Sequence, residues 1–216
     1  MGRDVRTPGE AADEACKIAG LVLAAGRSTR MGQNKLLSVW RGAPLVAHVV
    51  DAALGAGLRP VCVVTGHEQA AVAEALRGHE LVLAHNPDFA RGMASSLRAG
   101  LGALGPAHDG VVVLLGDMPR VRPEHVLRLL EAFERGGRSV ICVPEHDGQR
   151  GNPVLWPARD VAALSALRGD VGGRNLLEAA RERVVRVAMP DDGVLFDVDS
   201  PPMLAALQAA SVEPHL

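Results

Sequence analysis

The sequence predicts a doubly wound α/β fold, with a mostly parallel Rossmann-like sheet, helices on both faces and an irregular or antiparallel C-terminal third. Short apolar runs alternate with stretches of helical periodicity, as in buried parallel strands joined by helices. The chain has 216 residues, of which 48% are hydrophobic and 22% charged, so it can bury a sizeable core. We expect residues 1–16 to form a flexible tail and residues 17–216 a single domain.

The expected elements follow one another with short connections. Pro44 and Pro123 each stand at the first turn of an amphipathic pattern and predict a helix there. After Val143 the chain becomes turn-rich, and further helices are expected near Arg159–Leu167 and Arg174–Arg181. A last helix is expected to start at Pro201. The strands are expected at Ile18–Ala24, Pro60–Val64, Leu81–Ala84, Gly110–Leu115 and Arg138–Val143, with a further strand in the segment VLFDVD.

Composition excludes several functional classes. Only 2% of the residues are aromatic and the formal net charge is −2, so neither stacking platforms nor a basic field for nucleic acid is available. The three cysteines lie far apart, which predicts no disulfide framework or zinc site and fits a reducing, cytoplasmic location. No apolar run approaches the ~20 residues of a membrane helix. Among 23 basic residues only Lys17 and Lys35 are lysines.

The loop after the first strand has the composition of a phosphate-binding site. Small residues at Ala24, Ala25 and Gly26 let backbone N–H groups approach an anion, and Arg27, Arg30 and Lys35 supply positive charge. The spacings of a P-loop, of the dinucleotide fingerprint GxGxxG and of the nucleophile elbow GxSxG are all absent. On the residues alone, a strand end followed by solvated arginines explains the loop equally well.

Three aspartates stand where a divalent cation could bind. Asp117 ends the strand Gly110–Leu115 in the segment GDMP, and Mg²⁺ prefers one or two carboxylates plus phosphate oxygens. In a strand, Asp197 and Asp199 would point to the same face, which suits a second carboxylate arm. Alternatively, Asp117 caps a turn and Asp199 caps the last helix.

The motif L-A-A-G-R-S-x-R-M-G-x-x-K resembles the signature of the molybdenum cofactor nucleotidyltransferase family, within the NTP-transferase superfamily, and is most similar to its cytidylyltransferases. In that family the loop wraps the triphosphate, and LAAG, here Leu23 to Gly26, accompanies a cytosine nucleotide. The resemblance extends from Ile18 to about Leu207. It implies nucleotide binding by Leu23, Ala24, Ala25, Gly26, Arg27, Arg30, Lys35, Thr65, Gly66, Asn86, Gly92, Ser96 and Asp117.

Two segments of the last third resemble the family motifs G-H-P-V-L-F and G-D-x-G-A-R-x-L-L. Here Asn152 stands where His is usual and Gly173 where Ala is usual. Both departures lie on the side that the resemblance assigns to the acceptor, so the acceptor is less specified than the nucleotide. The implied acceptor contacts are Gly151, Asn152, Pro153, Trp156, Asp170 and Arg174.

The resemblance implies Mg²⁺-dependent transfer of CMP from CTP to the terminal phosphate of molybdenum-molybdopterin. Lys35, Arg27, Arg30 and Asp117 would be catalytic, and Asp117 with Asp199, or alternatively Asp197, would bind the metal. A molybdoenzyme of the xanthine dehydrogenase type would receive the product. The alternatives are a guanylyltransferase, a nucleotidyltransferase with another phosphorylated acceptor, a non-catalytic cofactor-binding chaperone and an oxidoreductase.

Overall fold

The fold is built on one mixed, mostly parallel sheet. A computed structural model describes residues 16–28, 32–169 and 173–209. The strand order is β5-β4-β1-β6-β9-β7-β10, with β8 paired to β7, and a hairpin of β2 and β3 lies apart. The tail expected over residues 1–16 lies, except for Cys16, outside the described residues. The strands are β1 Ile18–Ala24, β2 Val39–Trp40, β3 Ala43–Pro44, β4 Val61–Thr65, β5 Val82–His85, β6 Gly110–Leu115, β7 Ile141–His146, β8 Gln149–Arg150, β9 Val154–Pro157 and β10 Val184–Ala188.

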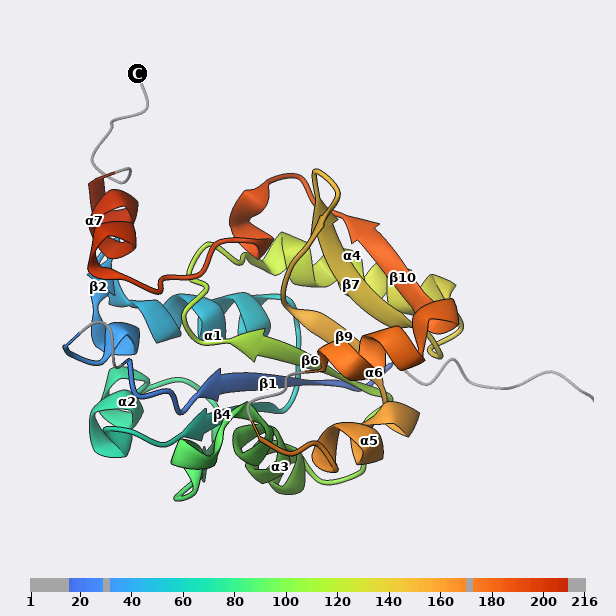
Figure 1. Cartoon of the computed structure of the whole chain (residues 1–216), viewed down its shortest axis with the longest axis horizontal. Helices are drawn as coiled ribbons and strands as arrows, with labels where there is room; N and C mark the ends of the chain where they lie inside the picture. Colours follow the sequence, from blue (N-terminus) through green and yellow to red (C-terminus); the bar gives the residue numbers. More distant parts are fainter. Residues whose placement is uncertain (1–15, 29–31, 170–172, 210–216) are drawn as a thin grey trace, which may run out of the picture.

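The parallel part of the sheet places several strand ends at one edge. The central strand β1 pairs in parallel with β4 on one side and β6 on the other, and β4 pairs in parallel with β5. β9 runs antiparallel between β6 and β7, whereas β10 is again parallel to β7. The carboxyl ends of β1 and β6 therefore lie side by side, on the left in Figure 1.

Helices cover both faces of the sheet. α1 and α4 lie on one face, and α3 and α5 lie on the other (Figure 1). Successive residues of β1 enter different cores: Val22 packs with the helices α1 and α4, and Leu21 packs with α3. This burial on both sides explains the continuous apolar run of β1. The helices are α1 Leu45–Gly55, α2 Gln69–Ala75, α3 Met93–Leu104, α4 Pro123–Arg135, α5 Val161–Ser165, α6 Arg174–Ala179 and α7 Pro201–Ala209.

The predicted fold class is confirmed, and one element within it is wrong. β1 and β6 have the expected bounds, and β9 supplies the antiparallel strand of the last third. The segment VLFDVD, however, forms no strand: a 3₁₀ turn at Asp192–Val194 is followed by irregular chain up to α7. The reason is that the Val198 N–H donates to the Asp117 carbonyl, in the loop beyond β6, instead of joining a strand ladder.

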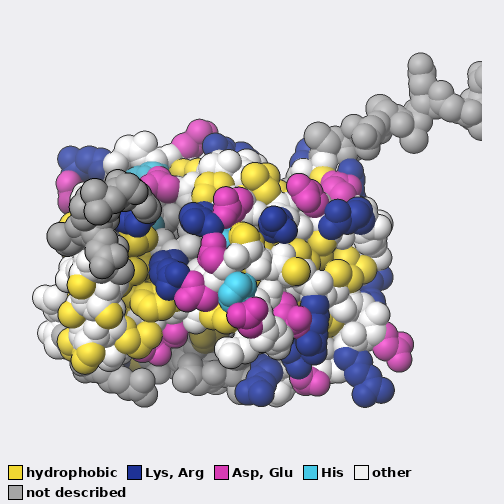
Figure 2. Space-filling view, turned by 90° about the horizontal axis from the view of Figure 1, so that it is seen from above, with side chains coloured by type: hydrophobic (Ala, Val, Ile, Leu, Met, Phe, Trp, Pro, Cys, Tyr) yellow, Lys and Arg dark blue, Asp and Glu magenta, His cyan; other side chains and the backbone are white. Residues whose placement is uncertain are grey.

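One face of the molecule does not gather charge of one sign. Figure 2 shows acidic and basic side chains interspersed on the face that is uppermost in Figure 1. Within the described ranges, no helix is long and apolar enough to cross a membrane.

Candidate active site

Three charged side chains from distant parts of the chain meet beyond the carboxyl end of β6. Lys35 begins a 3₁₀ turn, Lys35–Leu37, after the first loop. Its Nζ lies 2.7 Å from Asp117 Oδ2 and 2.8 Å from Asp199 Oδ1. The structure thus brings two of the three predicted aspartates into contact with the ammonium group of the predicted lysine.

Backbone contacts hold these three residues in position. The Gly116 N–H donates to the Leu23 carbonyl over 3.0 Å, which fixes the start of the Asp117 loop beside the end of β1. The Val198 N–H donates over 3.0 Å to the Asp117 carbonyl, and the fully buried Val198 side chain anchors the segment that carries Asp199. Ser28 Oγ accepts a hydrogen bond from the Lys35 N–H over 3.1 Å. The geometry therefore depends on two loops and on the C-terminal segment together.

The charges of the group influence one another. Burial lowers the pKa of Lys35, but the charges and hydrogen bonds of Asp117 and Asp199 outweigh it and hold that pKa above its usual value. Burial raises the pKa of Asp197, and the nearby charges of Asp199 and Asp117 raise it further. Asp197 thus lies close to both carboxylates although the predicted strand is absent.

The donor set fits a divalent cation. The two carboxylate oxygens that contact Lys35 Nζ converge on a single position, where one ammonium group balances only one of the two negative charges. Mg²⁺ takes oxygen ligands and is commonly held by one or two carboxylates together with substrate phosphates. Asp117 and Asp199 are therefore suited to hold such an ion, with Lys35 then turning to other partners.

A cleft of about 570 Å³ opens beside this group. It is within the usual size range for small-molecule sites. A Cβ at Gly26 would meet no atom of the described residues within 4 Å, so their packing does not require glycine there. Arg27 lies with its guanidinium carbon 5.2 Å from the centre of the Phe89 ring. The predicted residues that line the cleft are Leu23, Ala25, Gly26, Arg27, Lys35, Gly92, Ser96 and Asp117.

Four predicted nucleotide-binding residues lie behind the cleft wall instead. Ala24, Thr65 and Asn86 are buried and do not line the cleft. The Asn86 side-chain amide donates to Ser95 Oγ and Ser96 Oγ over 2.8 and 3.0 Å, which ties the loop after β5 to the first turn of α3. A Cβ on Gly66 would lie 2.8 Å from the Ala25 carbonyl oxygen, so this glycine permits a close loop contact. These residues shape the cleft rather than line it.

A second cleft, of about 420 Å³, adjoins the first, because Met93 and Leu115 line both. Of the predicted acceptor residues, it is lined by Gly151, Asn152, Trp156 and Arg174. Pro153 follows a cis peptide bond and does not line it. Arg30 and Asp170, also predicted site residues, lie outside the described residues.

Several lining residues were missed by the sequence analysis. Phe89 and Arg91 stand in a 3₁₀ turn at the mouth of the first cleft, and Arg150 lines the second cleft. The Nη2 atom of Arg150 lies 3.4 Å from Oε1 of Glu178, a residue of the short helix α6. The position of Phe89, inside the segment HNPDFARG, was the only available signal for this group. Nothing in the local sequence distinguished Arg150 from the other arginines.

A further cleft, of about 690 Å³, lies elsewhere, between Trp40, the loop before α4 and α7. Two of its arginines already have carboxylate partners. Arg120 pairs with Asp192, and Arg122 pairs with Glu124 and Asp191. Its basic character is therefore compensated within the protein, and its size alone does not make it the reaction site.

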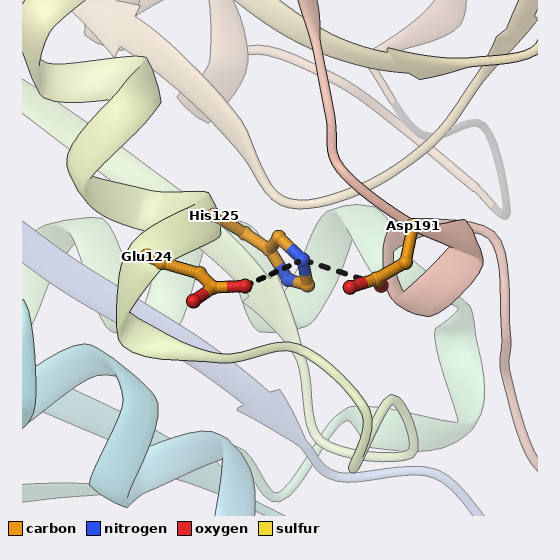
Figure 3. Close-up of side chains that lie close together, drawn as sticks. All are labelled: Glu124, His125 and Asp191. Carbon is orange, nitrogen blue, oxygen red and sulfur yellow. Dashed lines mark ion pairs between the residues drawn. The ribbon is translucent and has the colours of Figure 1, made fainter.

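One histidine lies between two carboxylates at the start of α4 (Figure 3). His125 Nε2 is 3.3 Å from Asp191 Oδ1 and 4.0 Å from Glu124 Oε1. The Arg122 N–H, which can only donate, points at His125 Nδ1 over 3.2 Å, so neutral His125 carries its proton on Nε2. That nitrogen has no lone pair to offer a metal, and both carboxylates already pair with Arg122. This group is a structural network at the helix start.

Open α/β sheets bind ligands beyond the carboxyl ends of their strands, and here the basic first loop, Asp117 and Asp199 meet beyond β6. Comparison with known proteins identifies the family. Residues 20–184 match the family described as MobA-like NTP transferase domain. The chain belongs to this family.

Two curated relatives match most of the chain. Nicotine blue oxidoreductase of Paenarthrobacter nicotinovorans is 31% identical over 191 residues, covering 85% of this chain and 92% of that protein. The purine catabolism protein PucB of Bacillus subtilis is 28% identical over 200 residues, with the same coverage. The bifunctional protein GlmU of Sorangium cellulosum is 34% identical over 134 residues, which are 58% of this chain and only 28% of GlmU.

Among solved structures, Rv0371c of Mycobacterium tuberculosis superposes with a TM-score of 0.78 at 31% identity, covering 90% of this chain and 98% of that one. The same mycobacterial protein has also been solved in complex with manganese, and that structure superposes with a TM-score of 0.73 at 28% identity, covering 90% of this chain and 99% of the other.

Proposed function

We propose that the chain transfers CMP from CTP to the terminal phosphate of molybdenum-molybdopterin, with Mg²⁺, and releases pyrophosphate. The observation that carries this proposal is the junction of two clefts at Met93 and Leu115, beside Lys35 and Asp117. Group transfer requires donor and acceptor to be held together at one point. One cleft would take the nucleotide and the other the acceptor.

The residues of the first cleft suit a triphosphate. Ala25 and Gly26 line the cleft, and Arg27 and Lys35 supply positive charge there. On nucleotide binding Lys35 would exchange its two carboxylate partners for oxygens of the leaving pyrophosphate and stabilise the charge that develops there. Asp117 and Asp199 would hold Mg²⁺, which neutralises phosphate charge when bound. The attacking phosphate is already an anion, so no protein base is needed.

The preference for CTP rests on Ala25. Its methyl group is buried at the wall of the nucleotide cleft and narrows the space available to a base. One methyl group is worth about 1–3 kcal/mol of discrimination, or roughly 10–200-fold. We therefore expect Ala25→Gly to raise the use of GTP relative to CTP.

The test is pyrophosphate release by the purified protein with Mg²⁺ and either CTP or GTP, with and without molybdenum-molybdopterin. We expect release that requires the acceptor and favours CTP. A GTP preference would replace the nucleotide assignment, and release without dependence on molybdopterin would replace the acceptor. No release with either nucleotide would instead favour a cofactor-binding chaperone, or an oxidoreductase like the relative from Paenarthrobacter nicotinovorans.

The recipient of the product would be a molybdoenzyme of the xanthine dehydrogenase type. This proposal is supported by the relative PucB, which is named as a purine catabolism protein. Purines are substrates of that type of molybdoenzyme. Transfer of the cytosine dinucleotide cofactor from this chain to the metal-free recipient, followed by recovered purine oxidation, is the corresponding measurement.

A further inference from the structure

The wall of the second cleft contains a large ring that also borders another hollow. Trp156 belongs to β9 and is only 3% exposed, yet it lines the second cleft. It also lines a smaller hollow of about 230 Å³, together with Leu176 and Ala180. A displacement of this indole in either direction would therefore change the shape of the second cleft.

Gly173 sets how close the chain comes to that ring. It is the residue before α6 and has φ −63°, a value that any residue adopts, so its backbone does not require glycine. A Cβ at this position would lie 2.6 Å from Trp156 Cζ2 and 3.0 Å from Cη2. Such distances are far below carbon–carbon contact, and the buried ring would have to move. Glycine is needed here for space alone.

The rest of this cleft has two characters. Its body is apolar, formed by residues such as Leu97, Val113 and Leu177, whereas Arg174 supplies positive charge at the same cleft, together with Arg150, which pairs with Glu178. An apolar slot with arginines suits a ligand that has a ring system and an anionic group. The position of the Trp156 indole decides how much of the slot such a ring can occupy.

We propose that the Trp156–Gly173 contact is the specificity-determining contact for the acceptor. Because Gly173 has no side chain, the indole can pack against its backbone, and in this position the indole leaves the second cleft open for the ring system of a phosphorylated acceptor. This inference rests on the proposed function for the identity of the acceptor. It concerns acceptor binding only, because neither residue lines the nucleotide cleft.

The kinetic test is a double-mutant cycle with Gly173→Ala and Trp156→Phe. In the parent protein we expect Gly173→Ala to raise the KM for the acceptor by about tenfold or more, while the KM for the nucleotide changes by less than about twofold. In the Trp156→Phe background, where the outer ring is gone, the same substitution should change the acceptor KM by less than about twofold. Equal effects in both backgrounds, or an equal rise in both KM values, would overturn the proposal.

A matched control is Gly102→Ala on α3, where a Cβ would meet no atom within 4 Å and φ is not positive. We expect it to leave both KM values unchanged. If Gly102→Ala also raises the acceptor KM, the effect of Gly173→Ala is not specific to the ring contact and the proposal fails.

A second readout does not depend on turnover. The chain has two tryptophans, so Trp40→Phe leaves Trp156 as the sole indole fluorophore. In that background we expect pterin-6-carboxylate to quench the emission, and Gly173→Ala to raise the Kd from quenching by about tenfold. An unchanged Kd, or no quenching by the probe, contradicts the inference. If the parent protein releases no pyrophosphate but the Kd shifts, the proposed function fails and the cleft assignment stands.

Discussion

Replacing Lys35 with alanine should weaken catalysis and strengthen metal binding at the same time. In the structure Lys35 Nζ holds the two carboxylate oxygens that we assign to the metal, at 2.7 and 2.8 Å. A cation entering this site must therefore displace the ammonium group. Removing it leaves Asp117 and Asp199 without this competitor, while it deprives the pyrophosphate of a positive charge.

The size of the effect follows from the distances. At about 3 Å and an effective dielectric of about 20, each contact has a raw Coulomb energy of about 5 kcal/mol. The Asp199 side chain is 49% exposed and Lys35 loses hydration in the site, so we retain only about 1–2 kcal/mol for the competition. This predicts roughly a tenfold rise in metal affinity. The loss of charge stabilisation predicts a fall in turnover of well over tenfold.

Two quantities are measured. The affinity for Mn²⁺ comes from titration of the nucleotide-free protein, monitored by calorimetry or electron paramagnetic resonance, and turnover comes from pyrophosphate release with saturating substrates. The control is Lys17→Ala, which removes the chain's other lysine, at the opposite end of β1. It should change neither quantity. If Lys35→Ala lowers the affinity for Mn²⁺ or leaves it unchanged, the competition between the ammonium group and the metal is refuted, and unchanged turnover would refute the catalytic role of Lys35.

Two further substitutions test other parts of the site. Asp117→Asn should lower turnover by well over tenfold with little change in the melting temperature, and it should also abolish tight Mn²⁺ binding. If this variant releases pyrophosphate at the rate of the parent protein, Asp117 has no part in the mechanism. Asn86→Ala removes the two hydrogen bonds to Ser95 and Ser96, so we expect a loss of about 1–3 kcal/mol in the free energy of unfolding and a higher KM for the nucleotide. Urea denaturation and initial rates measure these two effects, and an unchanged unfolding free energy would show that the bonds are dispensable.

The local sequence predicts the sheet well because burial leaves a direct mark on it. β1 and β6 are buried on both faces, so their apolar runs end where the strands end. The order of the strands in the last third carries no such mark. β9 has four residues and takes its antiparallel place from pairing with β6 and β7, which are contacts distant in sequence.

In the candidate active site, too, some residues can be predicted from local motifs and others are placed by contacts distant in sequence. Residues whose chemistry is visible in a motif, such as Lys35 and Asp117, come together as expected. Asp199 joins them for another reason than the predicted strand, because the backbone bond between Val198 and Asp117 holds its segment there. The departure from the family motif at Gly173 also has a physical reason that only the structure provides: the Trp156 ring fills the space of a Cβ.

The network at the start of α4 predicts a pH dependence of stability that the reaction site does not share. Burial lowers the pKa of His125 below its usual 6.5, against the opposing charge of Asp191 (Figure 3). The folded protein therefore binds fewer protons here than the unfolded chain, and stability falls as pH drops through 6.5 toward the lower pKa of the folded state. The pKa of Asp191 is also lowered, by its hydrogen bond from Gly193 and by His125 and Arg122 against the effect of burial, so its contribution is lost only at more acidic pH, below the usual 3.8.

In urea unfolding between about pH 5 and 7, His125→Gln should thus show a shallower decrease of stability than the parent, whereas replacement of the exposed His85 by Gln should keep the parental slope. A parental slope in His125→Gln would mean that His125 takes up protons equally in the folded and unfolded states, which would contradict a lowered pKa in the folded protein.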